Sequence, residues 1–82
     1  MAKETKYYWL TYPIKLLQRP LLSELSRRFA LATHLRSVNV TENHGQVSLE
    51  LSGDNRKIAQ AIRWIRKQGV EVDQLVMGTP AS

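Results

Sequence analysis

An α+β sandwich is the fold that the sequence predicts, and the order of its segments is the main reason. Short stretches with strand-like composition are separated by two amphipathic stretches with helical spacing, in the order strand, helix, strand, strand, helix, strand. The two central strands are joined by a short turn and form a hairpin between the helices. Two right-handed crossovers then place both helices on one face of a four-stranded antiparallel sheet, which is the ferredoxin-like arrangement.

The first strand is predicted over residues 6–12, "KYYWLTY", which are rich in aromatic and β-favouring residues and precede Pro13. Pro20 is expected in the first turn of the first helix, which ends near Ala30. Apolar residues at three- and four-residue spacing give this helix one buried face, which consists of Leu21, Leu22, Leu25 and Phe29.

The hairpin is predicted from two alternating runs, at residues 34–42 and 46–52. They are joined at Asn43, His44 and Gly45, residue types that tolerate positive φ. The residues expected on the buried face of the hairpin are Val38, Val40, Val47, Leu49 and Leu51.

The second helix is predicted over residues 55–68, with Asp54 as its N-cap and Gly69 just beyond its last residue. A closing strand follows at 70–76, and residues 77–82 are expected to be a flexible tail. The apolar stripe of this helix consists of Ile58, Ala61, Ile62 and Ile65.

Length and composition predict a single small domain over residues 1–82, with its core at about 6–76, because 82 residues cannot enclose a second core. The chain has no Cys, so we expect neither disulfides nor thiolate metal sites. No apolar run approaches the roughly 20 residues that span a bilayer, and the N-terminus lacks a signal-peptide core, which predicts a cytoplasmic protein. The formal charge of +5 favours an acidic partner without specifying one.

Catalytic and cofactor sites are not indicated by the sequence. His44 lies in the predicted hairpin turn, and His34 has no second His, Cys or Asp at a spacing typical of metal sites or nucleophilic triads. The four Gly residues are scattered, so there is no phosphate-binding loop. We therefore predict a binding module that is not an enzyme and needs no cofactor.

The first strand is predicted to present Tyr7, Trp9 and Thr11 on the face of the sheet that the helices do not cover. Three interpretations remain open: a solvated surface, burial in a homodimer, and a platform for single-stranded RNA. The third strand disfavours RNA, because it offers no aromatic residue and exposes Glu50 on the same face. We therefore do not expect nucleic acid to bind this face.

The second helix carries an outward basic stripe, which is either a solvated surface or a docking surface for an acidic protein or for phosphates. Trp64 lies at the edge of the apolar stripe and is expected to close the rim of the core. The residues of the outward stripe are Arg56, Gln60, Arg63 and Lys67, with Lys57 and Arg66 beside them.

Three segments, "LLSELSRRF", "VSLELSGD" and "AIRWIRKQGVEV", resemble the NIL domain, and the resemblance covers roughly residues 7–76. It implies a ferredoxin-like fold related to ACT domains, which commonly pair into dimers and bind amino acids near subunit junctions. In methionine-importing ABC transporters the NIL domain is the C-terminal part of the ATPase subunit, where it binds methionine and inhibits transport.

The family takes its name from an Asn-Ile-Leu motif at the start of the second strand, and the matching residues here are His34, Leu35 and Arg36. The resemblance implies that these residues lie at a ligand site. An Arg at this place binds carboxylate or phosphate well, so a ligand more acidic than methionine is expected.

The connection after the first strand is apolar, which is unusual for a segment between Pro13 and Pro20. Its side chains either pack against the first helix or a dimer mate, or line a ligand pocket together with His34 and Arg36. The apolar residues are Ile14, Leu16 and Leu17. The resulting prediction is a homodimeric module that senses an amino-acid-like ligand and signals to a partner; the alternative is a ligand-free adaptor that docks through its basic helix faces.

Overall fold

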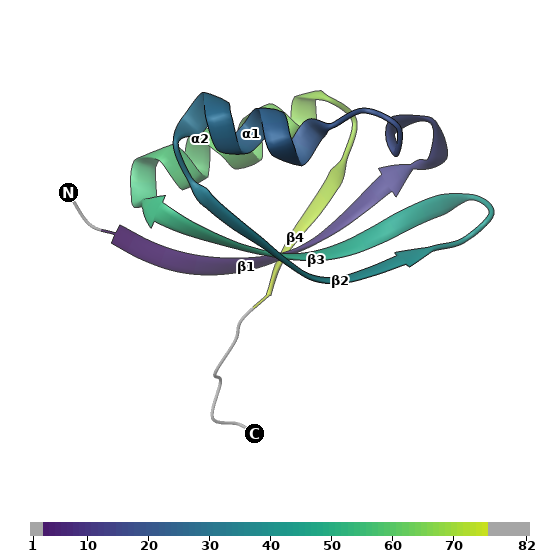
Figure 1. Cartoon of the computed structure of the whole chain (residues 1–82), viewed down its shortest axis with the longest axis horizontal. Helices are drawn as coiled ribbons and strands as arrows, with labels where there is room; N and C mark the ends of the chain where they lie inside the picture. Colours follow the sequence, from purple (N-terminus) through teal and green to yellow (C-terminus); the bar gives the residue numbers. More distant parts are fainter. Residues whose placement is uncertain (1–2, 76–82) are drawn as a thin grey trace, which may run out of the picture.

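The sheet of the computed structural model has the strand order β2-β3-β1-β4, and all neighbouring strands are antiparallel. Figure 1 shows both helices on one face of this sheet, which confirms the ferredoxin-like prediction. The structure describes residues 3–75, so the predicted tail at 77–82 lies outside the described residues. The elements are β1 (Lys3–Pro13), the 3-10 turn η1 (Ile14–Leu16), α1 (Leu21–Phe29), β2 (Ala32–Val40), β3 (His44–Asp54), α2 (Asn55–Lys67) and β4 (Glu71–Leu75).

The core lies between the helices and the two central strands, β1 and β3. Burial raises the pKa of Tyr12 to about 12 and also raises the pKa of Tyr8, so both phenols are neutral at physiological pH. Phe29 and Trp64 are half-buried at the rim and meet edge to face, with ring centroids 6.1 Å apart, as expected for Trp64. The fully buried side chains include Leu10, Leu21, Leu25, Leu49, Leu51, Ile58 and Ile65.

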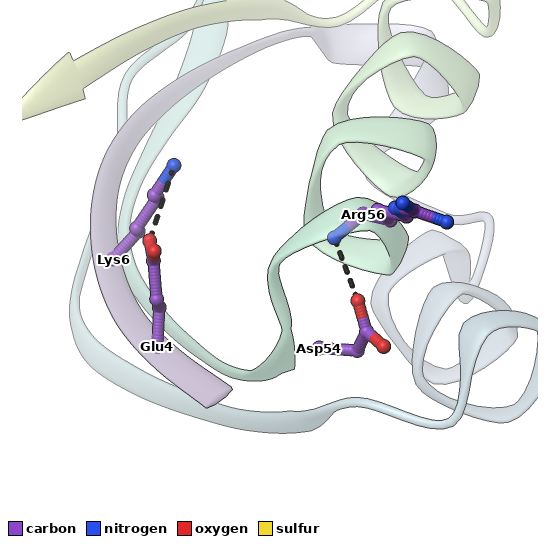
Figure 2. A network of polar contacts seen from close by, with 4 residues as sticks. All are labelled: Glu4, Lys6, Asp54 and Arg56. Atoms are coloured by element: carbon purple, nitrogen blue, oxygen red, sulfur yellow. Dashed lines mark hydrogen bonds and ion pairs between the residues drawn. The ribbon is translucent and has the colours of Figure 1, made fainter. Parts of the chain in front are cut away.

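The second helix begins and ends where its capping residues predict. The Asp54 carboxylate accepts a hydrogen bond of 2.8 Å from the backbone N–H of Arg56, and Figure 2 shows this contact beside the Glu4–Lys6 ion pair. Gly69 follows the helix with a φ of 105°. The first helix differs in one detail, because Pro20 is the N-cap residue and does not belong to the first turn.

The turn of the hairpin is formed by Thr41 and the two residues after it, so His44 and Gly45 belong to β3 and the predicted turn position is wrong. The Thr41 hydroxyl accepts hydrogen bonds from the backbone N–H groups of Asn43 and His44, at 3.3 and 3.2 Å. It also donates to the His44 carbonyl at 3.0 Å. A side-chain turn of this kind needs no residue with positive φ, which is why the positive-φ argument misplaced it.

Strand β2 is exposed although its apolar residues lie on the helix side of the sheet. Val38 pairs with Val47 and so lies on the predicted face, yet Val38 is 58% exposed and Val40 is 57% exposed. The prediction that both valines are buried is wrong, because β2 is an edge strand and its hairpin end extends past the helices (Figure 1). Alternation assigns the face of a residue, whereas burial also needs a covering element.

Candidate functional site

An open hollow of about 570 Å³ lies between the first helix and the beginning of β2. It is lined from α1 by Leu22, Ser23, Ser26 and Arg27, and from β2 by Thr33, His34 and Leu35. Two of the residues that match the family motif, His34 and Leu35, therefore line one hollow together.

The lining combines apolar side chains with a cation. The Arg27 guanidinium offers a fork of N–H donors suited to a carboxylate, and the Ser23 hydroxyl is a second polar group. The Ser26 hydroxyl is already used, since it donates to the Leu31 carbonyl at 2.9 Å. Apolar walls with a few polar groups are typical of sites for small organic molecules.

The predicted pocket wall at the first connection lies at the opposite end of the sheet. Gly45 pairs with both Tyr12 and Val40, so β1 and β2 end at the same end of the sheet, on either side of β3, and η1 follows β1 directly. His34 lies six residues before Val40 along β2, a distance of about 20 Å in an extended strand. A pocket that one chain forms from both groups of residues is therefore ruled out.

Two side chains of the connection pack against their own domain. A Cβ on Gly45 would come within 2.6 Å of a Leu17 methyl, so Leu17 covers the sheet at this glycine. Leu16 approaches Gly69 in the same way, at 3.3 Å from such a Cβ. Ile14 stays 46% exposed. The connection is thus apolar mainly because it closes this end of the core, and only Ile14 is free for another molecule.

Arg36 lies at a bulge in β2 and contacts the open face of the sheet. The register shifts between Leu35 and Ser37, so that His34 pairs with Glu50. The Arg36 guanidinium forms an ion pair of 3.6 Å with Glu50 and lies 5.2 Å over the Tyr7 ring. Arg36 is therefore separate from the lining of the hollow, where Arg27 is the cation.

The open face carries the two aromatic residues that the sequence assigns to it. Tyr7 pairs with Glu50, and Trp9 pairs with Ser48. Ser48 is only 9% exposed although its side chain faces away from the helices. Both rings are half-buried among polar neighbours. Trp9 is well placed to shield Ser48 from solvent. The open face is therefore a polar surface on which two aromatic side chains cover part of their polar neighbours.

The outer surface of the helices is basic. A hollow of about 330 Å³ on α2 is lined by Gln60, Arg63, Trp64 and Lys67. Arg56, the remaining predicted member of the stripe, is exposed one turn before Gln60. The structure thus brings Arg63 and Lys67 together at one hollow, as their spacing predicts.

Comparison with known proteins gives the family directly. The family model described as the NIL domain matches residues 6–74. The chain belongs to the NIL domain family. No curated protein sequence matches it.

Solved structures share the fold of this NIL domain at low sequence identity. The C-terminal domain of an ABC transporter ATP-binding protein from Enterococcus faecalis is 20% identical, with a TM-score of 0.76 over 88% of this chain and 84% of that chain. A putative PII-like signaling protein from Thermus thermophilus is 15% identical, with a TM-score of 0.51 over 95% and 96%. The designed protein Foldit4 reaches a TM-score of 0.60 at 16% identity over 92% and 98%. These likenesses establish the fold.

Sequence reasoning missed the α1 side of the hollow in this NIL domain. Ser23 and Arg27 are one helical turn apart, as are Leu22 and Ser26, so each pair shares a face. Short serine side chains on α1 leave space between the helix and the edge strand β2. This composition was the signal in the sequence that could have predicted the hollow.

Neither a cluster of metal-binding residues nor a membrane-spanning helix is found within residues 3–75 of the NIL domain. Within that range no group of three or more His, Cys, Asp or Glu residues is placed to hold a metal ion. Neither of the helices described there is long and apolar enough to cross a bilayer.

Proposed function

We propose that this NIL domain is a non-enzymatic sensor that pairs through β2 into a homodimer, binds a small amino-acid-like ligand at the junction and signals to a partner protein. One observation carries the proposal: an open hollow with an apolar and cationic lining lies beside an edge strand whose apolar side chains are uncovered. The family membership supports a regulatory role.

Strand β2 is suited to pair with a second copy. It has nine residues and lies at the outer edge of the sheet formed by the described chain. A strand edge of this length offers unpaired N–H and C=O groups, and apolar side chains add to its tendency to associate. Antiparallel pairing about a two-fold axis keeps the helices of both copies on the same side of a continuous sheet. Leu35 of one copy then lies close to Val38 of the other, because the two strands run in opposite directions.

The same pairing unites the two groups of predicted ligand residues. In an antiparallel β2 pair centred near Ser37, the beginning of one β2 lies beside the end of the other. The hollow at His34 then faces Val40 of the second copy and the loop that carries its exposed Ile14. A residue set that one chain separates by about 20 Å thereby becomes one site.

The ligand class follows from the lining. Arg27 binds a carboxylate through paired hydrogen bonds, because its fork of N–H groups matches the two oxygens. Leu22 and Leu35 accept an apolar side chain, while Ser23 is available to a polar group of the ligand. An α-amino acid or a related small carboxylate presents these features together.

Signalling to a partner uses the open face. Arg36 is adjacent in sequence to Leu35 and contacts both Glu50 and Tyr7 on that face. A ligand that changes the pairing of β2 also changes this cluster. A partner protein then detects the change by binding the polar surface around Tyr7 and Trp9.

Two measurements test the proposal together: sedimentation analysis of the oligomer, and NMR titration with amino acids and small carboxylates. The wild type is expected to dimerise, and its ligand is expected to shift amide signals at Arg27, His34 and Leu35. Val38→Lys inserts a charge into the apolar side of β2 and should give a monomer whose ligand affinity falls by about tenfold or more. Asn39→Lys is the matched control, because it adds the same charge on the polar side.

Three results would contradict this function. A wild type that stays monomeric at high concentration removes the dimer. Ligand binding by Val38→Lys as tight as that of the wild type places the whole site in one chain. The absence of localised shifts at millimolar concentrations of every compound tested ends the sensor proposal.

A further inference from the structure

We infer that the outer surface of the two helices binds the phosphate backbone of duplex nucleic acid, without reading its base sequence. This surface lies on the helix layer, away from the proposed dimer edge, and of its cations only Arg27 also lines the α1–β2 hollow. The inference goes beyond the sensor function and stands or falls separately from it.

Charge is distributed unevenly between the layers of the molecule. Helices α1 and α2 carry seven of the 12 Lys and Arg residues but only one of the seven acidic residues. That residue, Glu24, is paired with Arg19 at 3.6 Å. All seven helix cations are exposed, and five of them are arginines, whose guanidinium groups bind phosphate in a bidentate manner. They are Arg27, Arg28, Arg56, Lys57, Arg63, Arg66 and Lys67.

Each of the four residues that line the hollow on α2 has a side-chain hydrogen-bond donor. Arg63 and Lys67 lie one turn apart, and the Trp64 indole N–H and the Gln60 amide complete the lining. Like charges one turn apart repel each other and destabilise an isolated helix, and a bound anion relieves this repulsion. The α2 helix has no acidic residue that does so within its 13 residues.

Apolar exposure argues for nucleic acid over protein or membrane. The large apolar residues that are exposed in the described chain, Ile14, Leu35, Val38 and Val40, all lie outside the two helices. A protein interface needs an apolar core or aromatic anchors, and a membrane-binding helix needs apolar residues to insert. Interfaces with nucleic acid are polar and positively charged.

Duplex is favoured over single-stranded nucleic acid because the aromatic rings of the helices, Phe29 and Trp64, already contact other side chains. The Arg28 guanidinium lies 5.2 Å over the Trp64 ring, and Phe29 contacts the same ring edge to face. Single-strand binding requires free aromatic faces on which bases stack. Backbone contacts along α2 need only exposed cations, and a helix of this length spans about 20 Å.

Fluorescence anisotropy with a labelled duplex DNA of about 20 base pairs tests the inference, at salt concentrations from about 50 to 200 mM. The affinity of the wild type is expected to fall steeply with salt. The double variant R63E/K67E should lose at least about tenfold in affinity, and the slope of log K against log salt should decrease by about two. Lys15→Glu is the matched control for Lys67→Glu, because both replace an exposed Lys with Glu and only Lys67 lies on the helices.

A second variant guards against loss of folding. Arg56→Glu lies in the first turn of α2, where an acidic side chain is favourable for the helix dipole, so it reverses a charge of the stripe while supporting the fold. It is expected to weaken duplex binding severalfold. Circular dichroism of each variant confirms the helix content.

The competing partners are outcomes of the same experiment. If Lys15→Glu weakens binding as much as Lys67→Glu, only the net charge matters and the inference is wrong. If polyglutamate of equal charge displaces the duplex at equal concentration, the surface fits an acidic protein. If a single strand binds more tightly than the duplex, the stacking argument fails and the inference fails with it.

Discussion

Strands β2 and β3 are neighbours with the same alternating pattern, yet one is exposed and the other forms the core. Leu35 and Leu49 are register partners on the same face of the sheet, but Leu35 is 49% exposed and Leu49 is 1% exposed. Val38 and Val47 differ in the same way. The strands differ in position, because β3 is central and lies under the helices, whereas β2 is an edge.

The burial of a strand residue has two causes, which a sequence pattern alone does not distinguish. The alternation of side chains along a strand determines on which face of the sheet a residue lies. Whether that residue is buried depends on whether a helix covers that part of the face. An apolar residue on an uncovered part of this face buries only about half of its surface in the fold of one chain. Its apolar surface is available for a second chain, and this is why β2 has the central place in the proposed dimer.

Truncating the two register partners gives the largest expected effect. Leu49→Ala removes a buried side chain and leaves a cavity, which should lower the free energy of unfolding by about 3 kcal/mol. Leu35→Ala removes exposed surface and should cost less than about 1 kcal/mol. Urea unfolding at a protein concentration low enough to exclude dimers measures both. Equal losses would show that β2 is covered within the single chain and would break the comparison.

The sequence predicts most of the fold because the relevant signals are local. Alternation assigns Tyr7, Trp9 and Thr11 to the open face, which leaves Tyr8, Leu10 and Tyr12 towards the helices, and the Asp54 cap and Gly69 mark the limits of α2. Each of these depends on the chemistry of a few adjacent residues.

The candidate site is harder to predict because its geometry is not local. A crossover helix returns the chain to its starting end, so β2 begins at the same end of the sheet as β1 and far from η1. The bulge at Arg36 breaks the alternation and puts Arg36 on the open face with Glu50. Neither effect is visible in the spacing of apolar residues, and both moved predicted ligand residues away from one another.

The second prediction concerns Tyr12, which is buried under the helices on β1, a central strand like β3. The pKa of Tyr12 is about 12 in the folded state and near 10 in an unfolded chain, because burial disfavours the phenolate. Unfolding therefore releases a proton between these pH values, so stability is full below pH 10 and falls as pH rises to 12. We expect a loss of about 2 kcal/mol over this range, measured by urea unfolding.

Tyr12→Phe is the control for this pH dependence. It removes the titrating group and keeps the ring, so the alkaline loss should decrease to the part that Tyr8 contributes in the same direction. A pH profile that is unchanged in Tyr12→Phe would show that other groups cause the alkaline unfolding.

The smallest expected effect lies where α1 ends and the chain turns towards β2. Ala30 has φ 53° and ψ 49°, a left-handed conformation that costs an L-residue about 1 kcal/mol, whereas glycine adopts it freely. Ala30→Gly should therefore stabilise the domain by about 0.5 kcal/mol, since the added freedom of the unfolded chain offsets part of the gain. The same substitution at the exposed Ala59 in the middle of α2 should destabilise it by about 1 kcal/mol. Thermal unfolding of both variants checks the opposite signs. A destabilised Ala30→Gly would instead mean that the alanine methyl supports the path of the chain into β2.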